Sequence, residues 1–293
     1  RDGATVSTMD RHEITEDRII RDMVGRDMAH RYPERTPKVG EMLMEVQGWT
    51  VWHPEQQGRK VIADAAFAVR KGEIVGIAGL MGSGRTELAM SIFGRTYGRD
   101  ISGSVRMSGK AGDVSTVARA VKAGLSYVTE DRKALGLILE EPIVRNTTLA
   151  NLPGVSRHGV LDKRRETRVA EEYRRLLGIR TPGVQQKVVN LSGGNQQKVV
   201  LSKWLYTDPQ VLILDEPTRG IDVGAKYEIY TIMKDLAAQG RGVVMISSEM
   251  PELLGMCDRI YVMNEGRIVG ELAREEASQE RIMAMILKTS GKA

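Results

Sequence analysis

The segment that constrains the fold most runs from residue 73 to residue 93. A short apolar run at 73–77 leads into Gly79-Leu-Met-Gly-Ser-Gly-Arg-Thr, and a helical pattern of apolar residues follows at 87–93. Gly79 and Gly84 place flexible backbone between a strand and a helix, so that successive N–H groups and the helix N-terminus can surround a phosphate. The segment therefore predicts a phosphate-binding loop. A glycine-rich turn that binds no ligand is the structural alternative.

Two side chains of this loop have specific expected roles. Thr86 stands where a hydroxyl would ligate Mg²⁺, and Arg85 occupies a position at which such loops carry lysine. The planar fork of an arginine is bulkier than an ammonium and places its charge differently on the β- and γ-phosphates, so we expect nucleotide binding to survive and hydrolysis to be impaired. The expected nucleotide contacts of the loop are Gly79, Gly82, Ser83, Gly84, Arg85, Thr86 and Glu87.

From about residue 41 onward, short β-branched runs alternate with helical patterns, which predicts an α/β fold with a mainly parallel sheet covered by helices. The expected strands are 73–77, 124–128, 211–215, 242–247 and 259–263. Residues 41–70 and 101–109 show short alternating runs that predict a small antiparallel lobe. No strand pattern interrupts residues 146–208, so we expect a helical subdomain inserted at about 135–205.

An apolar run at 211–214 ends in two acids, Asp215 and Glu216. The carboxyl edge of a parallel sheet is where a Mg²⁺-holding carboxylate and a water-activating carboxylate belong, so we assign the metal to Asp215 and the base role to Glu216. An apolar strand capped by acids is common, and the motif is weak alone. The residues that follow it, Pro217-Thr-Arg-Gly-Ile-Asp222, strengthen the assignment and make Asp222 a further candidate contact.

A second anion-binding segment lies just upstream of that strand, at Leu191-Ser-Gly-Gly-Asn-Gln-Gln-Lys. Ser192 is expected to cap a helix whose glycines let backbone donors approach a γ-phosphate. One domain cannot sensibly direct this segment and its own phosphate loop at the same nucleotide. The candidate contacts here are Leu191, Ser192, Gly193, Gly194, Asn195 and Gln196.

These motifs, in this order, resemble the nucleotide-binding domain of ABC transporters over residue 41 to the end of the chain. The resemblance implies a P-loop NTPase (ABC ATPase) core that binds ATP and Mg²⁺. It also implies that two such domains pair, with the phosphate loop of one and the Ser-Gly-Gly segment of the other closing on each ATP.

The segments 79–88, 127–133, 191–198 and 214–222 are similar to the C-terminal half of the tandem ATPase subunit of bacterial importers of ribose, xylose, galactose and arabinose type. This resemblance implies a transport-coupled ATPase whose partners are a homologous N-terminal nucleotide-binding domain, transmembrane permease subunits and, indirectly, a periplasmic sugar-binding protein. It implies a peripheral location on the cytoplasmic face of the inner (plasma) membrane. Permease contacts are expected near residues 130–137 and in the helices that follow.

Compared with the family pattern, the chain departs at three positions of one site. Arg85 replaces lysine, Glu130 stands where a glutamine usually senses Mg²⁺ and the permease, and Ser248 stands where a histidine usually contacts the γ-phosphate. Loss of one charge-stabilising donor can cost about 10²- to 10³-fold in rate. We therefore expect an asymmetric pair, in which this domain's own site is degenerate and its Ser192, Gly193 and Gly194 complete the hydrolytic site of the partner.

Adenine stacking is assigned to Trp52, although Trp49 or His53 could replace it and a core aromatic explains Trp52 equally well. The single cysteine, Cys257, cannot form an internal disulfide and is expected to be a small buried hydrophobe. No apolar run approaches the roughly 18 to 20 residues that cross a bilayer.

The two ends of the chain resemble each other at a fixed offset. Gly3 matches Gly266, an offset of 263 residues, and Val6 and Ile19 fall on Val269 and Ile282. Each copy predicts a short strand followed by a helix. We interpret residues 1–30 as the tail of a preceding homologous domain, 31–40 as a linker and 41–293 as the ABC ATPase domain; chance similarity of two helical tails is the alternative.

The net charge of +5 is mild and dispersed, and no basic stripe interleaved with aromatic residues is visible, so no nucleic-acid partner is expected. Two other functions remain open. One is a soluble ABC-type ATPase without a permease, although the single cysteine speaks against the zinc modules of DNA-repair members. The other is a structural half that binds ATP without hydrolysing it.

Overall fold

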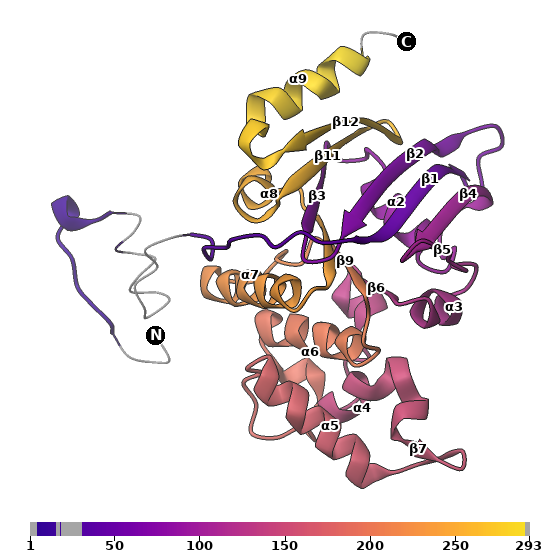
Figure 1. The fold of residues 1–293 in the computed structure, drawn as a ribbon. Coiled ribbons are helices and arrows are strands. Elements are labelled where there is room, and N and C mark those ends of the chain that lie inside the picture. The colour runs from indigo at the N-terminus through magenta and orange to yellow at the C-terminus, as the bar shows by residue number, and fades with distance from the viewer. Residues whose placement is uncertain (1–4, 16–17, 19–30, 291–293) are drawn as a thin grey trace.

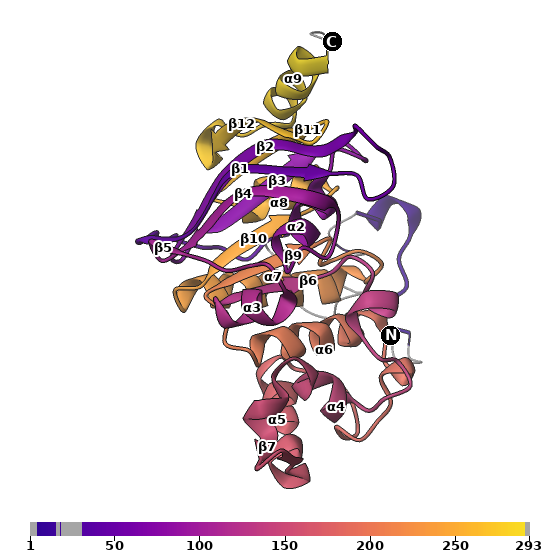
Figure 2. The same cartoon turned by 90° about the vertical axis from the view of Figure 1, so that its right-hand side faces the viewer.

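The computed structural model describes residues 5–15, 18 and 31–290. Its centre is a six-stranded sheet with the strand order β12-β11-β3-β10-β9-β6 (Figures 1 and 2). The strands are β3 (Ile74–Gly79), β6 (Leu125–Val128), β9 (Val211–Asp215), β10 (Gly242–Ile246), β11 (Arg259–Asn264) and β12 (Arg267–Ala273). Five of them run parallel, and β12 pairs antiparallel with β11. The five parallel strands expected from the sequence are confirmed.

Helices cover both faces of this sheet, as Figures 1 and 2 show from two directions. The helices α7 (Val223–Ala238) and α8 (Met250–Met256) cover one face, and α2 (Arg85–Ile92) and α3 (Val117–Lys122) cover the other. Leu212 and Leu214 pack toward the first group, while Val211 and Ile213 pack toward the second. Burial on both faces is the reason that β9 reads as a continuous apolar run without alternation.

A second sheet of four antiparallel strands, ordered β2-β1-β4-β5, lies beside α2. Its strands are β1 (Met42–Trp52), β2 (Lys60–Arg70), β4 (Arg99–Met107) and β5 (Lys110–Ala111). Trp49 is buried in the core that this sheet shares with α2, and its Nε1 donates to Ser91 Oγ at 2.9 Å. The expected antiparallel lobe is confirmed.

A helical group lies at the end of the molecule opposite the last helix, α9 (Gln279–Ser290) (Figure 1). It contains η2 (Arg132–Gly136, a π-helical turn), α4 (Ile143–Thr148), η3 (Leu149–Val155), α5 (Lys163–Leu176), η4 (Val188–Asn190) and α6 (Gly193–Leu205). The expectation of no strand in this region is wrong. A small hairpin joins β7 (Ser156–Arg157) to β8 (Val160–Leu161).

This hairpin escapes detection because two-residue strands are too short to show an alternating pattern. Its turn residues, His158 and Gly159, both have positive φ, at 51° and 78°. Positive φ at both central positions is the geometry of the tight turn that suits a two-residue hairpin loop.

The repeat seen in the sequence has a partial structural counterpart. Two short 3₁₀ helices, η1 (Arg11–Glu13) and η5 (Arg274–Glu276), lie at the same offset as the sequence match. The strand expected near Val6 is wrong, since residues 5–10 form none. In the C-terminal copy the equivalent strand, β12, pairs with β11, whereas residues 5–15 contain no strand for such a pairing. The helix expected around residues 19–23 lies outside the described residues.

Cys257 is fully buried, and burial raises the pKa of its thiol, as expected of a core residue. Within residues 5–15, 18 and 31–290, no helix is both long and apolar enough to cross a membrane.

Candidate functional site

The order of strands in the sheet assembles the candidate site. β3, β10, β9 and β6 are neighbours, and each is followed by a loop at the same carboxyl edge. The loops after β3, β10 and β6 carry the segment after Gly79, Ser248 and Glu130, respectively, while β9 ends in Asp215 and its loop begins with Glu216. Parallel sheets bind ligands at this edge. Four segments that are distant in the sequence therefore meet where a nucleotide would bind.

Two kinds of constraint require glycine in the phosphate loop: close contacts at the Cβ position and positive φ. A Cβ at Gly79 would lie 2.5 Å from Ser83 Oγ, and a Cβ at Gly84 would lie 3.0 Å from Ile62 Cδ1. Gly82 has open space around it, but its φ of 78° disfavours any side chain. Ser83 Oγ is buried without a hydrogen-bond partner. A buried hydroxyl without a partner, in a loop ahead of a helix N-terminus, fits a bound anion.

Arg85 does not extend freely into this loop. Its Nη1 donates to the carbonyl oxygen of Gly79, and its Nη2 lies 3.7 Å from Glu216 Oε1. The two side chains are only 10% and 11% exposed. The guanidinium therefore bridges the phosphate loop and the carboxylate that the sequence nominates as the base.

Asp215 is buried at the end of β9. The hydroxyl of Tyr127 donates to its Oδ2 at 3.0 Å, while Oδ1 is buried without a hydrogen-bond partner. Burial raises the pKa of Asp215 to about 6, and the nearby hydroxyls of Thr86 and Tyr127 oppose that rise. Tyr127 was not nominated from the sequence. Its place on a strand next to β9 was the only available signal.

These residues fit a magnesium ion. Mg²⁺ prefers oxygen ligands and usually takes one or two from protein, with the remainder from phosphates and water. Thr86 and the buried, unpartnered Oδ1 of Asp215 are such ligands. The described part of the chain contains no group of three or more His, Cys, Asp or Glu that could hold a metal ion.

Glu216 is held in an uncommon backbone conformation, with φ at 46°. Its backbone N–H donates to Ile246 O at 2.9 Å, and its Oε2 accepts a hydrogen bond from Ser248 Oγ at 3.1 Å. A non-glycine residue in this region costs of order 1–3 kcal/mol, which surrounding structure must offset. Arg85 and Ser248 thus contact the two oxygens of one carboxylate, and two of the three departures from the family pattern act on the same group.

Glu130, the third departure, is also engaged. Its carboxylate accepts from Arg219 Nη1 at 3.0 Å. The neighbouring Arg132 donates to the carbonyl oxygens of Arg219 and Gly220 at 2.8 and 3.3 Å. These hydrogen bonds connect the loop after β6 to the loop after β9.

The Ser-Gly-Gly segment begins α6, but Ser192 does not cap it as expected. Ser192 occupies the N-cap position without accepting from a helix N–H, and its Oγ instead accepts from Asn195 Nδ2 at 3.0 Å. The nearby Asn195 side chain outcompetes the backbone for this oxygen, while its own Oδ1 accepts from Arg180 N at 2.9 Å. Ser192 is exposed at the helix start.

The glycines of this segment have packing roles that the sequence did not reveal. A Cβ at Gly194 would lie 2.6 Å from Ala225 Cβ on α7, and one at Gly193 would lie 2.9 Å from Arg132 Nη2. Gln196 is buried and donates to the carbonyl oxygens of Val188 and Leu191, so it supports the turn from inside.

The remaining residues predicted to contact a nucleotide have contacts within the domain itself. Asp222 caps α7 by accepting from Ala225 N at 2.9 Å. Leu191 is buried, and Glu87 lies half-buried in the first turn of α2. Their contacts with a nucleotide stay predictions.

Of the three candidates for stacking on adenine, Trp49 is excluded because its side chain is buried in the core. Trp52 is half-buried, with Lys60 Nζ 5.0 Å from its ring centroid. His53 Nδ1 accepts from the backbone of Glu55 and Gln56. Adenine stacking on Trp52 stays a prediction.

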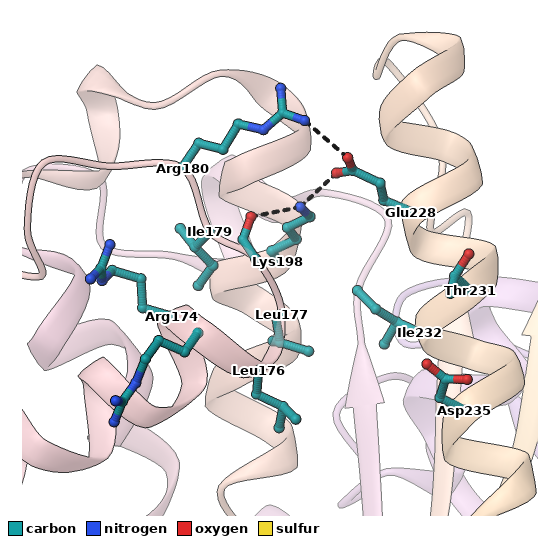
Figure 3. Close-up of a pocket in the computed structure, with 12 residues that line it drawn as sticks. Arg174, Leu176, Leu177, Ile179, Arg180, Lys198, Glu228, Thr231, Ile232 and Asp235 are labelled. Carbon is teal, nitrogen blue, oxygen red and sulfur yellow. Dashed lines mark hydrogen bonds and ion pairs between the residues drawn. The ribbon is translucent and has the colours of Figure 1, made fainter. Parts of the chain in front are cut away.

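A separate hollow of about 640 Å³ lies between α6, α7 and the end of α5 (Figure 3). Glu228 accepts from Lys198 at 2.6 Å and from Arg180 at 3.2 Å within it. Glu228 thus pairs with both of these cations, although one carboxylate balances only one of their two charges.

The family model described as "ABC transporter" matches residues 62–219. The chain belongs to the ABC transporter family. It is 61% identical to the L-arabinose transport ATP-binding protein AraG of Geobacillus stearothermophilus, over 99% of this chain and 57% of that protein. It is 53% identical to the xylose import ATP-binding protein XylG of Geobacillus kaustophilus (97% and 56% covered) and 46% identical to the ribose import ATP-binding protein RbsA of Bacillus subtilis (97% and 56% covered). The chain spans little more than half the length of these relatives.

Solved structures agree with the fold of this ABC transporter family member. The ADP form of MJ1267, an ATP-binding cassette, superposes with a TM-score of 0.70 at 20% identity, covering 85% of this chain and 99% of that one. The ATP-binding cassette MJ0796, a dimer with ADP and Pi, gives 0.67 at 19% identity over 79% and 99%. At such identities the likeness shows the P-loop α/β fold alone.

Proposed function

We propose that this chain is the C-terminal half of an ATP-binding subunit that powers import of a monosaccharide through an ABC permease. The observation that carries the proposal is the assembly of the phosphate loop, Asp215 and Glu216 at one sheet edge, in a chain 61% identical to an L-arabinose transport ATP-binding protein. The relatives named for xylose and ribose import support a monosaccharide as the substrate.

The tandem arrangement has its own support. The chain matches little more than half of each relative, and two 3₁₀ helices recur at the 263-residue offset between Gly3 and Gly266. We assign residues 1–30 to the tail of a preceding homologous domain, 31–40 to the linker, and 41–293 to this ATPase domain with its helical subdomain at about 135–205.

In the proposed reaction, the backbone of the phosphate loop holds the β- and γ-phosphates of ATP. Thr86 and Asp215 would hold Mg²⁺, which would neutralise phosphate charge when bound. Glu216 would orient and deprotonate the attacking water, and Ser248 and Glu130 are assigned to the γ-phosphate and to Mg²⁺, respectively. Trp52 stacks on adenine.

This site is proposed to turn over slowly because its base is occupied. Glu216 meets a guanidinium on one oxygen and a serine hydroxyl on the other. An arginine that pairs with the base cannot at the same time place its charge on the γ-phosphate. The domain therefore retains nucleotide and hydrolyses it poorly.

The Ser-Gly-Gly segment is proposed to act on the ATP of the N-terminal domain. Ser192 is exposed at the start of α6, as a contact to another domain requires. Met81, in the phosphate loop, is 97% exposed, which suits a face that a second domain covers. Each domain would thus close the other's site.

The test uses the full tandem subunit with its permease. We expect Ser192→Arg to abolish most ATPase activity, because it blocks the partner's hydrolytic site, and Glu216→Gln to leave most of it. Comparable losses from the two variants would contradict this division of labour. The chain of residues 1–293 alone should bind ATP and hardly hydrolyse it.

The permease contact distinguishes this function from that of a soluble ATPase or a non-hydrolysing half. Leu135 and Ile138, just after Glu130, are 63% and 49% exposed, which supports a docking surface for permease subunits on the cytoplasmic side of the membrane. We expect Leu135→Asp to abolish co-purification with the permease. The matched control is Val160→Asp, which changes a residue 70% exposed in the hairpin. Equal retention of the permease by both variants would show that Leu135 is not part of the contact, whereas no co-purification even of the unmodified protein would favour the soluble alternative.

A further inference from the structure

A buried carboxylate that has no part in the proposed reaction lies beneath two loops of the candidate site. Glu252, on α8, is only 1% exposed. It accepts four hydrogen bonds, from Thr218 Oγ1 at 2.7 Å, Tyr230 OH at 2.6 Å, Ser247 Oγ at 2.8 Å and Lys226 Nζ at 3.1 Å. Burying a charge is costly unless it is paired and hydrogen-bonded, and here both requirements are met.

The four donors come from three separate parts of the chain. Thr218 lies two residues after Glu216, in the loop that follows β9. Ser247 immediately precedes Ser248, in the loop that follows β10. The other two donors lie on α7. One carboxylate therefore joins both loops of the hydrolytic edge to a helix on the face of the sheet.

Glu252 is charged at neutral pH. Burial tends to raise its pKa, but the hydroxyls of Thr218, Tyr230 and Ser247 and the charge of Lys226 outweigh burial, and the pKa is lowered. An ionised carboxylate only accepts hydrogen bonds, so all four donors point toward it. Hydrogen bonds to a charged group are stronger than neutral ones.

We propose that Glu252 is a positioning residue for hydrolysis: it fixes the loop of Glu216 relative to the loop of Ser248. The side chains of Glu216 and Ser248 meet at 3.1 Å, and the side-chain hydroxyls of Thr218 and Ser247, from the same two loops, both donate to the Glu252 carboxylate. The base role of Glu216 belongs to the proposed function, whereas the coupling of the two loops does not depend on it.

The segment before β1 supports the same arrangement from outside. The ring of Tyr32 packs on Tyr230 with centroids 5.3 Å apart and also lies against Gly255 of α8. Tyr32 OH is buried without a hydrogen-bond partner, whereas Tyr230 OH bonds to Glu252. Phenylalanine substitution removes one hydroxyl from either of these two contacting tyrosines, and only the hydroxyl of Tyr230 bonds to Glu252.

The experiment compares Tyr230→Phe with Tyr32→Phe in the whole chain without nucleotide, by hydrogen–deuterium exchange. For Tyr230→Phe we expect amide exchange at residues 216–222 and 247–251 to rise about tenfold, the size expected for a lost hydrogen bond to a charged group. For Tyr32→Phe we expect exchange like that of the unmodified chain. Exchange in α5 should stay constant in both variants.

A second pair tests the same carboxylate through the other loop. Thr218→Val removes a hydroxyl at nearly constant volume, and Thr218→Ser retains it. We expect Thr218→Val alone to increase exchange at 247–251, across the sheet edge, and to speed release of mant-ATP with Mg²⁺. Equal exchange in Tyr230→Phe and Tyr32→Phe, no rescue by Thr218→Ser, or a rise spread evenly into α5 would overturn the proposal. Because the exchange measurement needs no hydrolysis, failure of the proposed ATPase function would not mimic any of these results.

Discussion

At the residue scale, side-chain partners decide what the nominated residues can do. The sequence indicated that Arg85, Glu130 and Ser248 weaken one site, and the structure adds that Arg85 and Ser248 converge on Glu216. A sequence gives the chemical type at each position, but a salt bridge between residues 85 and 216 depends on the neighbouring positions of β3, β10 and β9.

The first prediction concerns Arg85→Lys. A lysine offers one compact ammonium and cannot bond to Gly79 O and Glu216 in the forked manner of the guanidinium, so Glu216 is released toward water. We expect single-turnover hydrolysis of radiolabelled ATP at this site to rise about tenfold or more. Arg106→Lys, on exposed β4, is the matched control. An unchanged or lower rate would show that the arginine does not restrain Glu216.

The second prediction concerns Asp215, whose pKa is raised to about 6 by burial. The folded chain then binds a proton more tightly than the unfolded chain, so the ionised carboxylate lowers stability above pH 6, and this cost fades as the pH falls below the folded pKa. Asp215→Asn should raise the free energy of unfolding of the nucleotide-free chain at pH 7.5 by about 2–3 kcal/mol, with little gain near pH 4. Mg²⁺-dependent ATP binding should be lost.

Asp113→Asn is the control. Because Ser115 lowers the pKa of that exposed carboxyl, its removal should lower the free energy of unfolding at pH 7.5, whereas Asp215→Asn should raise it. Denaturant unfolding at several pH values measures both variants. A stability gain for Asp215→Asn that does not change with pH would contradict the assignment.

At the element scale, contacts between helices explain residues that looked like ligand contacts. Gly194 admits α6 close to α7, and Gln196 fastens the turn before α6. The sequence placed both in a phosphate-binding segment, and it had no means of showing that α7 lies behind that segment. A helix start can thus be constrained by its packing before any ligand is considered.

The third prediction is that Gly194→Ala pushes α6 from α7. Its new Cβ would lie 2.6 Å from Ala225 Cβ, and overpacking of this kind costs about 1–3 kcal/mol. Gly183→Ala is the matched control, since nothing lies within 4 Å of its Cβ position. Urea unfolding measures both. Equal stability of the two variants would mean that the helices move apart without cost.

At the scale of the whole molecule, the segment before β1 is part of the domain's packing. Arg35 forms an ion pair with Asp258 at 2.5 Å, with both side chains 8% exposed, and also donates to Gly72 O. Asp258 in turn accepts from Ile74 N at the start of β3. The stretch expected to be a polar linker is thus anchored to the central sheet.

The fourth prediction is that Arg35→Ala destabilises the chain by about 3–5 kcal/mol, because it leaves Asp258 buried without its cation. Arg145→Ala is the control, since its pair with Glu141 is 65% and 36% exposed and such pairs contribute about 1 kcal/mol or less. Thermal unfolding of the two variants compares these costs. A small loss for Arg35→Ala would show that residues 31–40 contribute little to the domain.

Local pattern was enough to predict the parallel strands, the phosphate loop and the acids after β9, because backbone periodicity, glycine spacing and residue chemistry act over a few neighbours. It missed the β7–β8 hairpin, whose strands are too short to show an alternating pattern. It also assigned Ser192 a capping hydrogen bond, whereas the Oγ of Ser192 accepts from Asn195. Tertiary structure alone decided that Glu252 accepts hydrogen bonds from three segments, that Trp49 is buried in the core and that Arg85 pairs with Glu216. Those contacts depend on the order of the strands in the sheet. This order makes neighbours of residues that lie far apart in the sequence, and no local pattern reveals that they touch.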